Sequence, residues 1–190
     1  VESKTTAPHF YLRGSAQVNR LMALRAEIND GEDVRVSVND LVIKAVAAAM
    51  VRVPAMNVIW TADAIRQFHT VDMAVAIATE SGLVTPVLRN VEDMPVRHIA
   101  ATTKDYAERA RAGSLKQAEL EGGSTSVTNL GMFGTEDFDA IINPPHASIL
   151  AVGAATEQPI VADGHVTVGA VMKVSLSVDH RPVDGATAAE

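Results

Sequence analysis

Hydrophobic positions along the chain form long helical stretches separated by shorter runs. Residues 41–50 are apolar almost without interruption, which predicts a helix buried on all sides and ended by Pro54. Residues 96–112 instead carry apolar and charged side chains on opposite sides of a helix, with Gly113 as its stop signal. Weaker helical spacing over residues 21–28 predicts a third helix.

The remaining hydrophobic positions form short runs that are typical of β-strands. Asp163-Gly164 separates the last two runs and predicts a two-residue hairpin turn. Pro86 cannot donate a backbone hydrogen bond, so its strand is expected at a sheet edge or interrupted. The expected strands cover residues 9–13, 58–60, 65–68, 71–78, 83–88, 124–129, 148–152, 159–161 and 166–178.

Helices and strands follow one another without a regular alternation, which indicates an α/β fold with a largely mixed sheet. Residues 1–7 are polar and are expected to be a mobile arm at the end of a linker, and residues 8–190 are expected to form one domain. Residues 186–190 resemble the first turn of a helix cut short. We therefore expect the domain to be incomplete at its C-terminus and the chain to be a fragment of a longer polypeptide.

Composition and charge exclude several classes of function. The 190 residues include 16 Lys and Arg against 23 Asp and Glu, and the resulting net charge of −7 argues against nucleic acid or an anionic membrane as a partner. There is no cysteine, so any thiol chemistry must use thiols of the substrates. No apolar run is long enough to span a membrane. The six histidines have no metal-ligand spacing, so we expect no metal site.

The most informative polar motif is Asp-His-Arg-Pro-Val-Asp-Gly at residues 179–185, directly after the alternating apolar run of residues 171–178. This order places His180 at the mouth of a strand, and an imidazole with a pKa near 6.5 can take and return a proton near neutrality. The spacing alone does not separate a catalytic base from a surface histidine. No Gly-x-Ser-x-Gly nucleophile motif is present, and the glycines of residues 131–134 are too sparse for a dinucleotide fingerprint.

Several segments taken together identify a family resemblance. Residues 128–134 read Thr-Asn-Leu-Gly-Met-Phe-Gly and precede the 179–185 motif, and five further segments match in the same order: residues 8–12, 37–45, 82–87, 141–145 and 149–153. The set resembles the catalytic domain of the dihydrolipoamide acyltransferases, the core components of 2-oxo acid dehydrogenase complexes. The resemblance covers the chain from Pro8 onward and is strongest to acetyl-transferring members. It implies a two-layer, mixed-sheet fold like that of chloramphenicol acetyltransferase.

The resemblance also implies a reaction and roles for individual residues. The family moves an acyl group between the thiols of dihydrolipoamide and coenzyme A. His180 corresponds to its general base and Thr128 to the hydroxyl that stabilises the oxyanion. Asp184, with Arg181 nearby, corresponds to a support that holds the active-site loop through an ion pair. The positions that correspond to the coenzyme A site are Arg25, Ser37, Asn129, Met132 and Gly153.

Assembly and location follow from the same resemblance. The family forms homotrimers in which His180 would face Thr128 of a neighbouring chain, and the trimers can build cubic or dodecahedral cores. Expected partners are a lipoyl group on a separate domain, a decarboxylase and dihydrolipoamide dehydrogenase. The expected location is the bacterial cytoplasm or the mitochondrial matrix. No metal, nucleic acid or membrane is expected to take part.

Two other functions stay open at this point. The chain could be a non-catalytic core protein with the same fold, but both His180 and Thr128 are present, which argues against that function. It could also be a free-standing acyltransferase of the same superfamily, such as one that modifies an antibiotic. Such an enzyme shares the His-x-x-x-Asp-Gly motif with the family. The match of residues 128–134 disfavours this second alternative.

Overall fold

The computed structural model describes residues 2–80 and 82–190. The α-helices are α1 (Glu2–Thr6), α2 (Asn19–Asn29), α3 (Val38–Arg52), α4 (Val96–Arg111) and α5 (Gly185–Ala189). The 3₁₀ turns are η1 (Pro54–Met56), η2 (Gln117–Glu119) and η3 (Gly131–Phe133). The strands are β1 (His9–Gln17), β2 (Val58–Trp60), β3 (Ile65–Gln67), β4 (Met73–Val75), β5 (Ile77–Thr79), β6 (Gly82–Val84), β7 (Val87–Leu88), β8 (Thr125–Asn129), β9 (Ser148–Ala162) and β10 (His165–Asp179).

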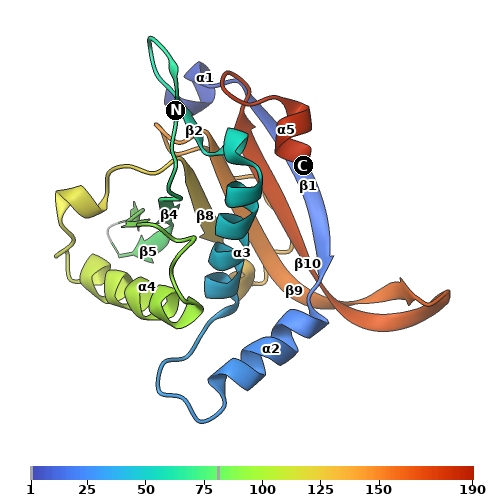
Figure 1. Ribbon diagram of the computed structural model, residues 1–190. Helices are drawn as coiled ribbons and strands as arrows, with labels where there is room; N and C mark the ends of the chain where they lie inside the picture. The colour runs from blue at the N-terminus through green and yellow to red at the C-terminus, as the bar shows by residue number, and fades with distance from the viewer. Residues whose placement is uncertain (1, 81) are drawn as a thin grey trace.

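A six-stranded sheet in the order β1-β10-β9-β8-β4-β7 forms the centre of the molecule (Figure 1). β1, β10 and β9 pair antiparallel, whereas β8 runs parallel to both β9 and β4. β7 closes the far edge antiparallel to β4. The predicted mixed-sheet α/β fold is confirmed.

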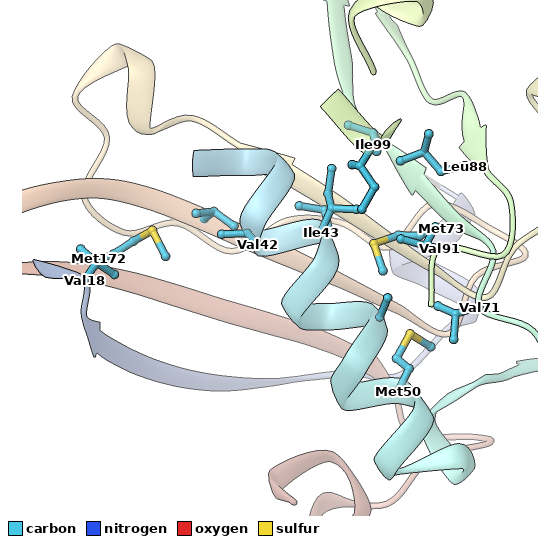
Figure 2. Close-up of a cluster of buried hydrophobic side chains, with 14 residues drawn as sticks. Val18, Val42, Ile43, Met50, Val71, Met73, Leu88, Val91, Ile99 and Met172 are labelled. Atoms are coloured by element: carbon cyan, nitrogen blue, oxygen red, sulfur yellow. The ribbon is translucent and has the colours of Figure 1, made fainter. Parts of the chain in front are cut away.

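α3 and α4 cover one face of this sheet and bury the main hydrophobic core (Figures 1 and 2). Ile43 of α3 and Ile99 of α4 are both fully buried and lie beside Leu88 and Met73 of the sheet. Truncating a side chain such as Ile43 to Ala typically costs about 2–5 kcal/mol, because a cavity remains. α3 begins with a capping box, in which Ser37 Oγ accepts from Asp40 N at 3.1 Å and the Asp40 carboxylate accepts from Ser37 N at 2.7 Å.

The prediction that α3 is buried on all sides is wrong. One side packs in the core, but Ala45, Ala48 and Val51 are exposed, with Val51 54% accessible. A single helix layer covers the sheet, so the outer side of α3 has no further layer above it. Apolar composition predicted burial correctly only for the side that faces the sheet.

The opposite face of the sheet is covered by the irregular segment 134–147. Ser175 Oγ donates to Asp139 at 2.5 Å, and Ser177 Oγ donates to the Ala140 carbonyl at 2.6 Å. The bond from Ser175, aided by the Arg13 guanidinium at 2.5 Å, lowers the pKa of Asp139. This polar layer explains why buried serines alternate with apolar residues along β10.

Several predicted elements have different boundaries in the structure. The predicted strands 148–152 and 159–161 are one strand, β9, because the hairpin at Asp163-Gly164 pairs its whole outer half with β10. Residues 71–78 divide into β4 and β5, and the proline-containing strand divides into β6 and the edge strand β7, as Pro86 predicted.

The N-terminal residues were expected to be a mobile arm. Val1 lies outside the described residues, but residues 2–6 form helix α1, so that expectation is wrong for them. Ser3 is buried, and its hydroxyl donates to the Ile142 carbonyl at 2.5 Å. His9 also binds this segment, because its Nε2 accepts from Ile142 N at 3.2 Å. These bonds attach the start of the chain to segment 134–147.

Candidate active site

His180 follows the last residue of β10 and is exposed. Its backbone N–H donates to the Pro8 carbonyl at 2.9 Å, and its imidazole lies against the Phe10 ring with the ring centroids 4.8 Å apart. Nδ1 lies 3.1 Å from the Val183 carbonyl oxygen. A carbonyl only accepts, so Nδ1 must carry the proton, and in a neutral imidazole Nε2 is then unprotonated. The geometry therefore leaves one ring nitrogen able to accept a proton.

The three charged residues of the same motif, Asp179, Arg181 and Asp184, form different interactions from the expected one. Asp184 caps α5 by accepting from Thr187 N at 2.8 Å, and no ion pair of Asp184 occurs in residues 2–80 or 82–190. The ion pair instead joins Arg181 to Asp179, with Nη2 2.6 Å from the Asp179 carboxylate. Within the described residues, Asp184 therefore caps a helix instead of forming the expected ion pair. The hydrogen bonds from Thr187 lower the pKa of Asp184, so it is ionised near neutrality.

The ion pair of Asp179 is a feature that the sequence reasoning missed. Asp179 is 2% exposed, and its carboxylate also accepts from the backbone N–H of Arg181 at 3.0 Å. The Arg181 guanidinium lies 5.6 Å from the Trp60 ring centroid, which links the loop to the β2–β3 hairpin. The sequence signal for this ion pair was the position of Asp179 directly before His180 at the end of a buried strand, because a buried carboxylate needs a charged or hydrogen-bonding partner.

Thr128 lies on β8, between the parallel neighbours β4 and β9. Side chains alternate along a strand, and Val127 packs in the core under α3, so Thr128 and Ser126 lie on the opposite face. Thr128 is half-buried, and its hydroxyl has no partner among the residues that the structure describes. This O–H can therefore donate to a group outside the chain.

Thr128 and His180 do not meet within one chain. Thr128 pairs with Ala151 of β9, which pairs with Ser175 of β10, five residues before His180. At about 3.3 Å per residue and about 4.8 Å per strand, the two residues are roughly 16 Å apart along the sheet and 10 Å across it. One chain alone does not place the base beside the hydroxyl donor.

A groove of about 430 Å³ on the α3 side of β8 and β9 collects four of the five predicted coenzyme-binding residues. Met132 is the most exposed of them, at 84%. Asn129 is held by its neighbours: its Oδ1 accepts from Gly131 N at 2.8 Å and its Nδ2 donates to Asn39 at 3.3 Å. The four residues are Ser37, Asn129, Met132 and Gly153.

Gly153 has a packing role as well as a place in the groove. A Cβ at this position would lie 2.0 Å from the Glu136 carbonyl oxygen, so only glycine fits. Gly131 is similarly constrained, since its Cβ would lie 2.8 Å from the Gly153 carbonyl oxygen. These contacts let η3 and segment 134–147 lie directly on β9.

Arg25 does not line the groove but lies next to it. Its Nε donates to the Val36 carbonyl at 2.9 Å, and Val36 precedes the groove residue Ser37. Asn29 holds the same residue through both its amide atoms, at 2.9 and 2.7 Å. The structure thus places a half-buried guanidinium of α2 beside the rim of the groove.

A second buried histidine was not predicted. His146 is 5% exposed; its Nε2 donates to the Gly122 carbonyl at 2.8 Å, and its Nδ1 accepts from the Ser126 hydroxyl at 2.7 Å. Burial lowers its pKa, so it is neutral near pH 7. The residues before it belong to segment 141–145, which carries part of the family resemblance, but nothing in the sequence indicated that the histidine itself is buried.

The described part of the chain contains no candidate for a metal site or for a membrane-spanning helix. Residues 2–80 and 82–190 contain no group of three or more His, Cys, Asp or Glu side chains arranged to hold a metal ion. No helix in these same ranges is both long and apolar enough to cross a membrane.

The sequence matches one protein family over its whole length. The family profile described as 2-oxoacid dehydrogenases acyltransferase (catalytic domain) matches residues 1–190. The dihydrolipoyllysine-residue acetyltransferase component of the pyruvate dehydrogenase complex of Rickettsia bellii is 42% identical over all of this chain and 46% of its own length. The mitochondrial component of Schizosaccharomyces pombe is 46% identical over 99% of this chain and 40% of its own length. The chain thus spans under half the length of each relative.

Solved structures give the same result for the fold. The structure of Azotobacter vinelandii dihydrolipoamide acetyltransferase has a TM-score of 0.93 to this chain, with 32% identity over 99% of this chain and 79% of that one. That structure belongs to a study of the roles of one serine, one histidine and one asparagine in the catalytic mechanism of the Azotobacter enzyme. The cubic core of the pyruvate dehydrogenase multienzyme complex gives 0.93 at 31% identity, over 99% of this chain and 79% of that one. Chloramphenicol acetyltransferase, 18% identical with a TM-score of 0.55 over 96% of this chain and 84% of that one, shares the fold.

Proposed function

Because the chain belongs to the catalytic-domain family of the 2-oxoacid dehydrogenase acyltransferases, we propose that it transfers an acyl group between the thiols of dihydrolipoamide and coenzyme A. The observation that carries this proposal is the hydrogen bond of the His180 imidazole to the Val183 carbonyl. Its Nδ1–H is bound to the Val183 carbonyl, so Nε2 is the free proton acceptor that a thiol nucleophile needs.

The proposed reaction proceeds without a covalent enzyme intermediate. Nε2 of His180 takes the proton of the attacking thiol while its sulfur bonds to the thioester carbonyl carbon. The carbonyl electrons move to the oxygen, and the Thr128 hydroxyl donates a hydrogen bond to the resulting oxyanion. When the C=O bond re-forms, the original C–S bond breaks, and the departing thiolate takes the proton from His180. Neither a metal nor a cysteine of the chain takes part.

Residue spacing supports the roles of these two side chains. In the Azotobacter enzyme the studied serine lies 52 residues before the histidine, and the asparagine lies four residues after it. Thr128 lies 52 residues before His180, and Asp184 lies four after it. Threonine keeps the hydroxyl donor of serine. We assign Thr128 as oxyanion donor, His180 as base and Asp184 as a support of the loop.

Coenzyme A is proposed to bind in the groove between α3, η3 and β9. Ser37, Asn129 and Met132 present two polar groups and one apolar side chain there. Arg25 beside the rim is a suitable counter-charge for a phosphate of the coenzyme. Gly153 would contribute by letting η3 lie close to the sheet, rather than by contact with the ligand.

The separation of His180 and Thr128 supports a site shared between copies of the chain, which we propose to be a homotrimer. The β9–β10 hairpin projects away from the body (Figure 1). Its outer half presents exposed apolar residues on one face, since Val161 pairs with Val166 and Pro159 pairs with Val168. An exposed apolar face of this kind fits contact with a second copy. We propose that the trimers assemble further into a cubic or dodecahedral core.

The likeness to acetyltransferase components favours acetyl as the acyl group and a pyruvate dehydrogenase complex as the setting. The lipoyl group would be carried on a separate domain, and the decarboxylase and dihydrolipoamide dehydrogenase components would be partners. Relatives occur in bacteria and in mitochondria, so the proposed location is the bacterial cytoplasm or the mitochondrial matrix.

A transferase assay tests the proposal. The full-length protein is given free dihydrolipoamide with acetyl-, succinyl- or isobutyryl-coenzyme A, and we expect the highest kcat/KM with the acetyl donor. If the highest kcat/KM is found with another donor, the proposed acyl group is wrong but the proposed class of reaction stands. No turnover by an assembled, folded protein would favour a non-catalytic core. Turnover of an antibiotic in place of dihydrolipoamide would favour a free-standing acyltransferase.

A further inference from the structure

The start of β1 contacts the proposed catalytic base at two points. The Pro8 carbonyl accepts from the backbone N–H of His180 at 2.9 Å. Phe10, two residues later, lies against the imidazole with a centroid distance of 4.8 Å and an angle of 50° between the rings. β1 is anchored directly beside the histidine, because His9 pairs with Asp179 and Phe10 pairs with Val178.

Phe10 also packs against the apolar cluster to which Val183 belongs. The buried members of this cluster include Val178 and Val183, and the Val183 carbonyl is the acceptor for Nδ1 of His180. The Phe10 ring therefore lies against the imidazole and against the cluster that includes the residue that orients it. No other ring packs on His180 within the ranges that the structure describes.

One hydrogen bond does not fix the plane of an exposed imidazole. Rotation about the Cβ–Cγ bond would move Nδ1 away from Val183 and would turn a ring carbon toward the carbonyl in its place. An aromatic ring against one face of the imidazole restricts this rotation. With the rotation restricted, Nδ1 stays on the Val183 carbonyl and Nε2 keeps its direction.

We propose that Phe10 is a positioning residue that holds the imidazole of His180 in the orientation that presents Nε2 to the substrate thiol. This role rests on the proposed function, since it matters only if His180 is the base. It assigns a task in the reaction to the first strand of the domain, far from the motif of residues 179–185 in sequence. Phe10 acts through His180 and does not touch the reacting atoms.

Phe10→Leu and Phe10→Tyr test the proposal in the full-length assembled protein. Leucine keeps an apolar side chain for the cluster but removes the ring, so kcat should fall roughly 10- to 100-fold, as expected for a misplaced catalytic group. KM for both substrates should stay within about twofold, because Phe10 lies outside the coenzyme groove. Tyrosine restores the ring, so kcat should return to within about threefold of the wild type.

Tyr11→Leu is the matched control. Tyr11 is the next residue of β1, so its side chain lies on the other face, where it contacts Lys4 and the His9 ring rather than His180. The same aromatic-to-leucine change there should leave kcat unchanged. The Tm and the assembled fraction are measured for every variant, and kcat is expressed per assembled chain.

The outcomes separate the two claims. If the wild type is active and the Phe10→Leu and Tyr11→Leu variants have the same kcat, the proposed role of Phe10 is wrong. It is also wrong if the Phe10→Tyr variant is as slow as Phe10→Leu. An inactive wild type would overturn the proposed function instead. If Phe10→Leu does not assemble, Phe10→Met, which keeps more of the apolar volume, gives the same comparison with the control.

Discussion

The carboxylate of Asp184 accepts a hydrogen bond from the backbone N–H of Thr187 across 2.8 Å and so forms the N-cap of α5. The residue thereby holds the end of the loop that begins at His180, with the Val183 carbonyl one position before it. The Azotobacter enzyme has an asparagine four residues after its histidine. Asparagine and aspartate are both strong N-cap residues, so either residue could form this cap.

This capping role predicts different outcomes for two substitutions of Asp184. Asp184→Asn keeps the side-chain acceptor, so kcat should stay within about threefold of the wild type. Asp184→Ala removes the acceptor and loosens the Val183 carbonyl, so kcat should fall roughly 10-fold or more. Steady-state kinetics on both variants check this. If asparagine is as slow as alanine, the negative charge near His180 matters more than the cap.

His180→Ala should lower kcat by roughly 10²–10⁴, because it removes the proton acceptor for the thiol. The fold should remain, since the side chain is exposed and its backbone N–H can still donate to Pro8. Turnover and assembly are measured together. Near-normal turnover in an assembled variant would remove His180 from the mechanism.

Thr128→Ala should lower kcat by about 10²–10³ with little change in KM, as expected for an oxyanion donor that acts in the transition state. Thr128→Ser keeps the O–H and should retain most of the activity. The comparison of kcat and KM for the three proteins is the measurement. A serine variant as slow as the alanine variant would show that the threonine methyl matters and that the role is packing.

Local patterns predicted the elements well where a single physical rule dominates. Proline at residue 86 interrupted its strand, and Asp163-Gly164 formed the hairpin, because both depend on backbone geometry alone. The length of β9 was underestimated, since its outer half is stabilised by pairing with β10 rather than by an apolar run of its own. α3 had an exposed side because burial depends on how many layers cover the sheet.

The site shows the same division between local and tertiary information. The resemblance identified residues that line one groove, although they come from α3, β8, η3 and β9. The partners of these residues were not predictable. Asp184 and Asp179 both lie near Arg181 in sequence, and only the turn after β10 decides that Asp179 forms the ion pair. His146 has no local signal either, because its two partners come from β8 and from the loop at Gly122.

The buried His146 predicts a pH dependence of stability. Burial keeps its folded pKa below 6.5, so below pH 6.5 the unfolded chain binds a proton that the folded chain does not. Its contribution to the free energy of unfolding is therefore full above pH 6.5 and decreases as the pH falls toward the lowered pKa. His146→Gln should lose about 1–3 kcal/mol at neutral pH by breaking this hydrogen-bond network, and its Tm should vary less below pH 6.5.

Thermal unfolding between about pH 5 and 7.5 measures this effect. The control is His165→Gln, because His165 is exposed at the start of β10 and should behave like the wild type. Equal slopes of Tm against pH for the wild type and His146→Gln would show that another group causes any loss of stability in acid.

The distance between Thr128 and His180 within one chain predicts that two inactive variants can restore activity to each other. In a shared site, His180→Ala and Thr128→Ala chains that assemble together form some interfaces with an intact base from one chain and an intact donor from the other. Mixed trimers of the full-length variants should therefore recover a fraction of wild-type kcat, whereas each variant alone should not. The control is a mixture in which both chains carry His180→Ala, because no interface then has a base. Native mass spectrometry confirms mixing, and confirmed mixed trimers as inactive as either parent would show that the two residues act within one chain or not together.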